Sequence, residues 1–131
     1  MDESYEFMDC DFSDAVEPAV LDEGSEAQLE ITDATANGEK RYVLLKCRVL
    51  NQSTPTKSVR HFLFYPKVDD DAEKINNKKL MIKSAFSAFG IPTGTIDPQS
   101  MVGCTGWCIL GIEESAEYGR QNVVKGFSKA A

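Results

Sequence analysis

The sequence lacks the features that would place it in a membrane or among common nucleotide-binding enzymes. No apolar run approaches the roughly 18–20 residues that a membrane-spanning helix needs. The start, Met1-Asp2-Glu3-Ser4, has neither the basic nor the apolar region of a signal peptide. There is no GxxxxGK[ST] loop, and no GxGxxG motif follows an expected strand. We therefore expect a cytoplasmic protein that has no membrane attachment and binds no nucleotide by these routes.

Histidine is represented once and cysteine four times, at positions 10, 47, 104 and 108. Cys104 and Cys108 are separated by three residues, but no second ligand pair accompanies them, and His61 is far away in sequence. Cys47 lies in an expected strand, where a small thiol packs well in a core. A single histidine in an aromatic strand is weak support for nucleophilic catalysis. We expect no metal site, no cofactor and no enzymatic activity.

One acidic cluster, Asp69-Asp70-Asp71, leaves an alternative open. Three adjacent carboxylates could hold a divalent cation, as in a metal-dependent nuclease. A solvated loop that caps a helix explains them more simply, because Asp70 stands three residues before Glu73, the spacing of a capping pair. We favour the capping interpretation and expect Asp70 to be the cap.

The first part of the chain contains no positive charge. Residues 1–26 carry ten acidic residues and no Lys or Arg, whereas the whole chain has 21 acidic and 14 basic residues and a net charge of −7. Residues 27–131 therefore carry 14 bases against 11 acids, a charge of about +3. This asymmetry predicts an acidic, partly disordered arm over residues 1–22 and a mildly basic domain over residues 23–131. The aromatic residues of the arm are available to dock on the domain or on a partner. Its carboxylates could also lie in the DNA-binding groove and compete with phosphate when DNA is absent.

The hydrophobic pattern predicts three strands, one helix and two more strands. Strands are expected over residues 26–32, 42–50, 59–65, 107–112 and 121–127, with a turn at Asn37-Gly38 and a loop over residues 113–120. The amphipathic helix ends before Gly90-Ile91-Pro92. This order fits a mainly β protein, a five-stranded OB-fold barrel with the helix between strands three and four. Other α+β domains have the same order.

The second and third strands have faces suited to a nucleic acid. The third strand carries Arg60, Phe62 and Phe64 on one face and His61, Leu63 and Tyr65 on the other, and one set must form the core. We favour the first set as the ligand face, because an unpaired charge is costly to bury. Non-specific binding of single strands requires cations for phosphates and flat rings for bases. The residues expected to meet such a ligand are Lys40, Arg41, Tyr42, Lys46, Arg48, Arg60, Phe62, Phe64, Trp107, Arg120, Lys125 and Phe127.

Several loose motifs resemble a bacteriophage family long catalogued as a domain of unknown function, whose members look like OB-fold single-stranded DNA-binding proteins. The motifs consist mostly of glycines in expected turns and apolar residues in expected strands, and they are spread over most of the chain. They are residues 7–12 (FMDCDF), 23–34 (EGSEAQLEITDA), 87–92 (SAFGIP), 101–103 (MVG) and 122–127 (NVVKGF). The resemblance implies a protein that coats and protects single-stranded DNA in phage replication or recombination. It does not assign individual binding residues.

The expected partners are single-stranded DNA, with RNA as an alternative, and phage or host replication proteins. A homo-oligomer is left open. The rival interpretation is an OB-type protein-interaction module that recruits replication enzymes through its acidic arm, which the net charge of −7 favours.

Overall fold

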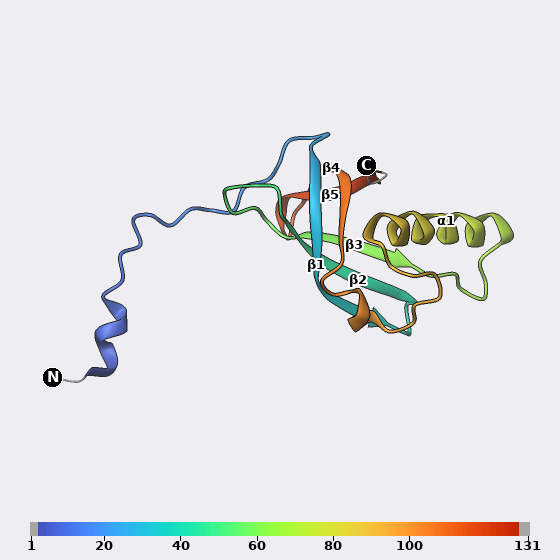
Figure 1. Cartoon of the computed structure of the whole chain (residues 1–131), viewed down its shortest axis with the longest axis horizontal. Helices are drawn as coiled ribbons and strands as arrows, with labels where there is room; N and C mark the ends of the chain where they lie inside the picture. Colours follow the sequence, from blue (N-terminus) through green and yellow to red (C-terminus); the bar gives the residue numbers. More distant parts are fainter. Residues whose placement is uncertain (1–2, 129–131) are drawn as a thin grey trace.

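The computed structural model describes residues 3–128, so residues 1–2 of the expected arm and 129–131 of the expected domain lie outside the described residues. It contains one five-stranded antiparallel sheet and one α-helix (Figure 1). The mainly β class and the helix between the third and fourth strands are confirmed. The elements are η1 (Glu3–Met8), β1 (Glu26–Asn37), β2 (Tyr42–Val49), β3 (Val59–Phe64), α1 (Ala72–Phe89), η2 (Pro98–Met101), β4 (Thr105–Ser115) and β5 (Gly119–Phe127).

Strand β1 lies at the centre of the sheet, whose strand order is β3-β2-β1-β4-β5. It was expected to end at Thr32, but it continues to Asn37. A β-bulge shifts its register with β2 between Ile31 and Asp33, and the pairing resumes after the bulge. Leu29 and Ile31 are buried before the bulge and Ala34 after it, so the extra residue returns the inward face to the core. The bulge also breaks the two-residue alternation, which is why the sequence pattern ends too early.

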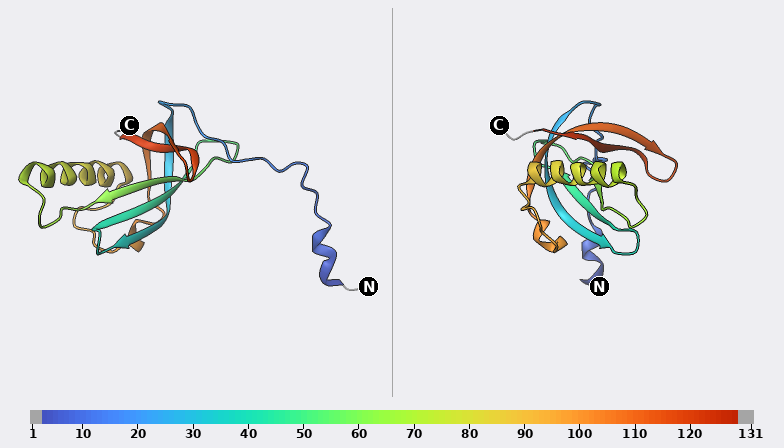
Figure 2. Two further views of the ribbon diagram at one scale, coloured as in Figure 1. Left: turned by 180° about the vertical axis from the view of Figure 1, so that it is seen from behind. Right: turned by 90° about the vertical axis from the view of Figure 1, so that its right-hand side faces the viewer.

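Strands β3 and β5 are the two edges of the sheet, and no β-ladder joins them among the described residues. Side chains close the space instead. The rings of His61 and Phe127 meet edge-on, with centroids 5.3 Å apart, and Phe127 meets Phe89 of α1 at 5.8 Å. Helix α1 packs against β3, β4 and β5 (Figure 2). The sheet is therefore strongly curved but is not hydrogen-bonded into a closed barrel.

Helix α1 begins one residue later than the capping pattern predicted. Asp71, not Asp70, is the N-cap, and its side chain accepts a hydrogen bond from the backbone N–H of Lys74. Asp70 accepts hydrogen bonds from the Lys67 backbone and from Lys78 Nζ at 2.6 Å, and both contacts lower the pKa of its carboxyl group. The helix ends at Gly90, whose φ of 66° lies in the left-handed region.

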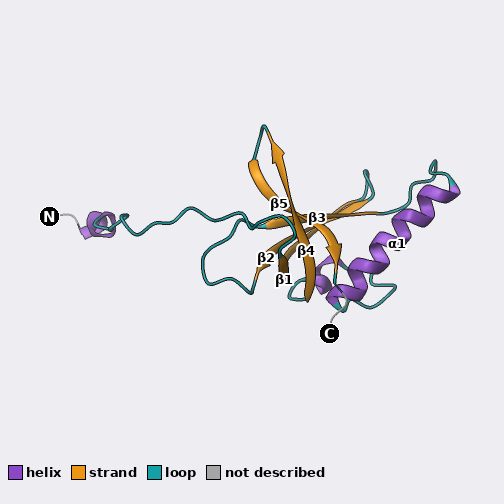
Figure 3. Cartoon of the chain, turned by 90° about the horizontal axis from the view of Figure 1, so that it is seen from above, coloured by secondary structure: helices purple, strands orange, loops and turns teal. Residues whose placement is uncertain are grey.

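Only the C-terminal half of α1 is packed into the core. Ala85, Phe86 and Phe89 are buried, whereas Leu80 and Met81 are 51% and 63% exposed. Figure 3 shows the N-terminal half of the helix projecting beyond the sheet. Neither α1 nor any other described helix is long and apolar enough to cross a membrane.

The last two strands form a longer hairpin than the sequence predicted. The segment expected to be a loop over residues 113–120 is mostly paired, from Glu113 with Gln121 to Ser115 with Gly119. Charged and polar residues along both strands hid this pairing, because the hairpin tip is exposed on both faces and shows no alternation. The hairpin therefore carries its tip well away from the core.

The chain before β1 is anchored to the sheet from Ala19 onward. Ala19 forms a parallel bridge with Thr56, and the buried Asn122 side chain bonds both the N–H and the C=O of Leu21 at 2.8 Å. Residues 5–18 extend away from the sheet, and all are exposed (Figure 1). The acidic arm is thus fixed only at its end.

Gly106 sets the distance between α1 and β4, which leads to a stability prediction. A Cβ at Gly106 would lie 2.5 Å from the carbonyl oxygen of Ala88. Because that oxygen belongs to the helix backbone, Gly106→Ala must push α1 away from the sheet. We expect the free energy of unfolding, measured by chemical denaturation, to fall by about 1–3 kcal/mol, as in other overpacked cores.

Gly38→Ala is the matched control, because a Cβ there meets nothing within 4 Å. We expect it to leave stability unchanged within about 0.5 kcal/mol. Equal stabilities for the two variants would contradict the close approach of α1 and β4.

Candidate nucleic-acid interface

Three aromatic rings gather on the outer face of β2 and β3. The antiparallel register places Tyr42 opposite Phe64 and Leu44 opposite Phe62. The rings of Phe62 and Phe64 are stacked, with centroids 5.5 Å apart and planes 12° from parallel. Tyr42 meets Phe62 edge-on at 5.2 Å and Phe64 at 6.1 Å. We call Tyr42, Phe62 and Phe64 the aromatic cluster.

Strand alternation explains why this cluster is accessible to solvent. Val59 and Leu63 of β3 are buried, and His61 is half-buried, so the intervening side chains must point outward. Phe62 and Phe64 are accordingly 41% and 51% exposed. The outward placement expected for Arg60, Phe62 and Phe64 is the one observed. Phe62 and Phe64 stack on each other and are still about half exposed, so part of their apolar surface is available to a ligand.

Basic residues continue this face along the same two strands. Lys46 lies directly opposite Arg60 in the β2–β3 register, one row beyond the aromatic cluster, and Arg48 follows on β2. We call Lys46, Arg48 and Arg60 the basic row. Arg48 is partly neutralised, because its Nε lies 2.6 Å from Glu30 Oε1 on β1.

The turn between β1 and β2 borders the aromatic end of the face. Arg41 ends this turn with a φ of 57°, in the left-handed region, and its carbonyl accepts a hydrogen bond from the Tyr65 N–H. Lys40 is exposed, and its backbone N–H is held by the side chain of Asn37 at 2.9 Å. A hollow of about 240 Å³ lies beside the turn, lined in part by Asn37, Arg41 and Tyr42. The turn thus places two cations next to the cluster.

The β4–β5 hairpin borders the basic end of the face. The ring of Tyr118, at the hairpin tip, lies under the guanidinium of Arg60 at 5.1 Å, a cation–π contact. Arg120 is exposed, and its Nε is 3.8 Å from Glu114. Sequence reasoning missed Tyr118, which is 51% exposed. The available signal was an aromatic residue in the same expected loop as Arg120.

Three of the expected residues lie elsewhere. Trp107 is on β4, opposite Gln28 of β1, and two strands separate β4 from β3. Lys125 is paired with Glu23 at the far edge of the sheet. Phe127 points inward, against His61 and Phe89. The outer face of β2 and β3 therefore brings together Tyr42, Lys46, Arg48, Arg60, Phe62 and Phe64, whereas Lys40 and Arg41 lie in the turn before β2 and Arg120 lies on β5.

The inner face of the sheet holds the titratable groups with the largest shifts. Burial raises the pKa of the Cys47 and Cys108 thiols to about 12, and lowers the pKa of the His61 imidazole. All four cysteines are free, and residues 3–128 contain no group of three or more His, Cys, Asp or Glu side chains placed to hold a metal ion. On the outer face, the basic row can attract anions and the aromatic cluster can stack on flat rings.

The sequence matches no protein-family model and no curated protein. The likeness to the phage family therefore stays a prediction from the motifs.

The two inward thiols lead to a labelling prediction. Because Cys47 and Cys108 are buried and their pKa values are about 12, almost no reactive thiolate is present near pH 8. Iodoacetamide is expected to modify the exposed Cys10 and to spare Cys47 and Cys108 until denaturant is added. Peptide mass spectrometry measures the three sites separately.

The Cys10→Ser variant controls for this prediction, since it should show no modification at position 10 and should still leave Cys47 and Cys108 unmodified in the native state, with the partly exposed Cys104 as the remaining accessible thiol. Rapid modification of Cys47 in the folded protein would mean that β2 faces the other way.

Proposed function

We propose that this protein is an OB-fold module that binds single-stranded DNA without sequence preference and does no chemistry of its own. The observation that carries the proposal is the aromatic cluster beside the basic row on the outer face of β2 and β3. Flat rings stack on any base, and neighbouring cations neutralise the phosphates between them. Sequence-independent binding follows, because stacking and phosphate neutralisation do not depend on which base is present.

The strand order supports the OB-fold part of the proposal. Proceeding around the sheet gives β3-β2-β1-β4-β5, with α1 between β3 and β4 in the chain and the edges β3 and β5 in side-chain contact. An OB fold is a five-stranded, partly open barrel that binds oligonucleotides with its second and third strands and with the loops after strands one and four. The aromatic cluster, Arg41 and Tyr118 occupy these same positions.

The resemblance to the phage family extends the proposal to biological context. It favours a protein that coats single strands during phage replication or recombination, in the cytoplasm of the host cell. RNA is a second ligand to test, because a stacking surface accepts either sugar.

A second candidate function, recruitment of replication proteins, is favoured by one observation. The acidic arm exposes Tyr5, Phe7 and Phe12 at 64%, 78% and 75% among carboxylates. Exposed aromatics on an acidic segment are a common basis for protein docking. A protein-interaction module of this kind would bind DNA weakly or not at all.

Fluorescence anisotropy of labelled oligo-dT tests the proposal. We expect saturable binding to the single strand and much weaker binding to the matching duplex, because a duplex hides its base faces. If about four phosphates are neutralised, log K should fall against log salt with a slope near −2.8, from about −0.7 per phosphate. No binding at low salt would overturn the proposal in favour of the recruitment module.

Alanine variants localise the binding to the aromatic cluster. Phe62→Ala and Phe64→Ala should each weaken binding by about 5- to 150-fold, since a stacked base is worth roughly 1–3 kcal/mol. Ile109→Ala is the control, because Ile109 is an apolar residue of β4 that is similarly exposed, at 38%. Equal losses for all three variants would place the ligand elsewhere.

Glu30 provides a prediction of tighter binding. Its carboxylate pairs with Arg48 on the proposed face and repels phosphate. Glu30→Gln should therefore strengthen oligo-dT binding by about two- to fivefold, since exposed charge pairs are worth up to about 1 kcal/mol.

Glu26→Gln, at the start of the same strand, makes the same change in net charge away from Arg48. An equal gain for Glu26→Gln would attribute the effect to total charge rather than to the release of Arg48.

A further inference from the structure

An apolar groove runs along α1 where the sheet is open. One hollow, of about 270 Å³, lies between the helix and β5 and shares Leu80, Ser84 and Phe127 with a larger hollow of about 610 Å³. A third hollow, of about 120 Å³, continues it along β3 through His61 and Met81 and reaches Phe62 and Phe64 of the aromatic cluster. We call this the α1 groove, lined by His61, Leu80, Met81, Ser84, Val124 and Phe127. It exists because β3 and β5 do not pair, so that the helix meets two free strand edges.

The rim of the α1 groove is basic. Helix α1 contains four lysines and only one acidic residue, Glu73. Lys83 lies at the second hollow, Lys125 at the first and Lys78 at the third. Lys78 is committed to Asp70 and Lys125 to Glu23, whereas Lys79 and Lys83 form no ion pair within residues 3–128. Apolar floor and basic rim together suit a segment that alternates aromatic and acidic side chains.

The chain itself contains such a segment. Residues 5–18, which we call the free segment, hold five acidic residues, no basic ones, and the side chains Tyr5, Phe7, Met8 and Phe12. Phe7 and Phe12 are 78% and 75% exposed, more than Phe62 or Phe64. Leaving two phenylalanines in water is unfavourable, and burying them in an apolar hollow removes this cost.

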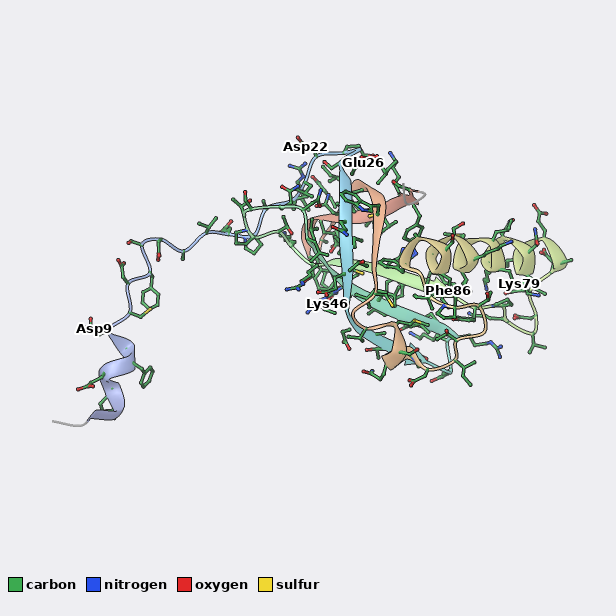
Figure 4. All side chains as sticks on the ribbon, viewed as in Figure 1. Asp9, Asp22, Glu26, Lys46, Lys79 and Phe86 are labelled. Carbon is green, nitrogen blue, oxygen red and sulfur yellow. The ribbon has the colours of Figure 1, made fainter. Side chains whose placement is uncertain are left out.

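The free segment points away from the α1 groove of its own chain. Figures 1 and 3 show it leaving the sheet on the side opposite to the projecting half of α1, and in Figure 4 Asp9 and Lys79 lie at opposite ends of the molecule. Fully extended, these residues span at most about 50 Å, and the path to their own groove passes around the whole sheet. The groove of a second copy is reached without this detour.

We propose that the free segment of one copy docks in the α1 groove of the next, with Phe7 and Phe12 in the hollows and the carboxylates beside Lys79 and Lys83. The contact is head-to-tail, because the free segment and the α1 groove are different surfaces. Each bound copy therefore still has an unoccupied groove or an undocked free segment. Copies therefore join in a row. The contact requires no DNA, and its test is independent of the proposed function.

A mixing experiment with full-length chains tests this arrangement by sedimentation velocity without DNA. The arm variant Phe7→Ala/Phe12→Ala keeps its groove, and the groove variant Leu80→Glu/Met81→Glu keeps its arm. All four side chains are exposed, so both variants should fold, which thermal unfolding checks.

The unmodified chain should show mass increasing with concentration and decreasing with salt. Each variant alone should stay monomeric, with association weakened about tenfold or more.

The equimolar mixture is expected to form a one-to-one pair and nothing larger, because only one arm–groove contact can form. Ile96→Glu is the control, since Ile96 is 94% exposed outside the groove and should leave association intact. The proposal is overturned if the unmodified chain stays monomeric at every concentration or if the mixture does not pair. Loss of association in Phe64→Ala but not in the groove variant Leu80→Glu/Met81→Glu would also overturn it, by placing the free segment on the aromatic cluster.

Discussion

The structure depends on one constraint: β1 must keep an apolar inward face while pairing with β2 along most of its length and with β4 at its start. The bulge at Thr32 satisfies this requirement, because one extra residue returns Ala34 to the side of Leu29 and Ile31 and bends the strand. The bend curls the sheet until β3 and β5 approach each other. Both surfaces of interest follow from the curl: a convex outer face on β2 and β3, and an opening that α1 only partly covers.

The outer face could be predicted from sequence where only one arrangement was physically acceptable. In β3, burying Arg60 without a partner would cost more than exposing Phe62 and Phe64, so the inward set had to be the one with Leu63. The structure adds what strand alternation cannot specify, namely that register brings Tyr42 against the edges of both phenylalanines and sets Lys46 opposite Arg60. The pairing partner of a residue depends on turn length and on bulges.

Other residues could not be placed from sequence because their positions depend on the fold as a whole. From the sequence, Phe127 was expected on the outer surface of its strand, yet its ring lies between His61 of β3 and Phe89 of α1. That space exists only because β3 and β5 do not pair. Two strands separate Trp107 from β3 because of the strand order, which local pattern does not reveal. The extension of β1 and the long β4–β5 hairpin were missed for a simpler reason: both lie where a bulge or double exposure removes the two-residue alternation.

The uneven charge resolves the apparent conflict between a net charge of −7 and a face suited to phosphate. Electrostatic attraction is screened over about 8–10 Å at physiological salt, so the charges that matter to a ligand are those beside it rather than the total. In Figure 4 the labelled Asp9 of the free segment lies well away from Lys46. On the sheet itself, Glu30 forms an ion pair with Arg48, and Asp33 lies opposite Lys46 in the β1–β2 register. An arm held in the groove of another copy would keep those carboxylates near lysines of α1. The same acidic segment can then coexist with the proposed phosphate-binding face, because Lys79 and Lys83 lie on α1 whereas Lys46 and Arg60 lie on β2 and β3.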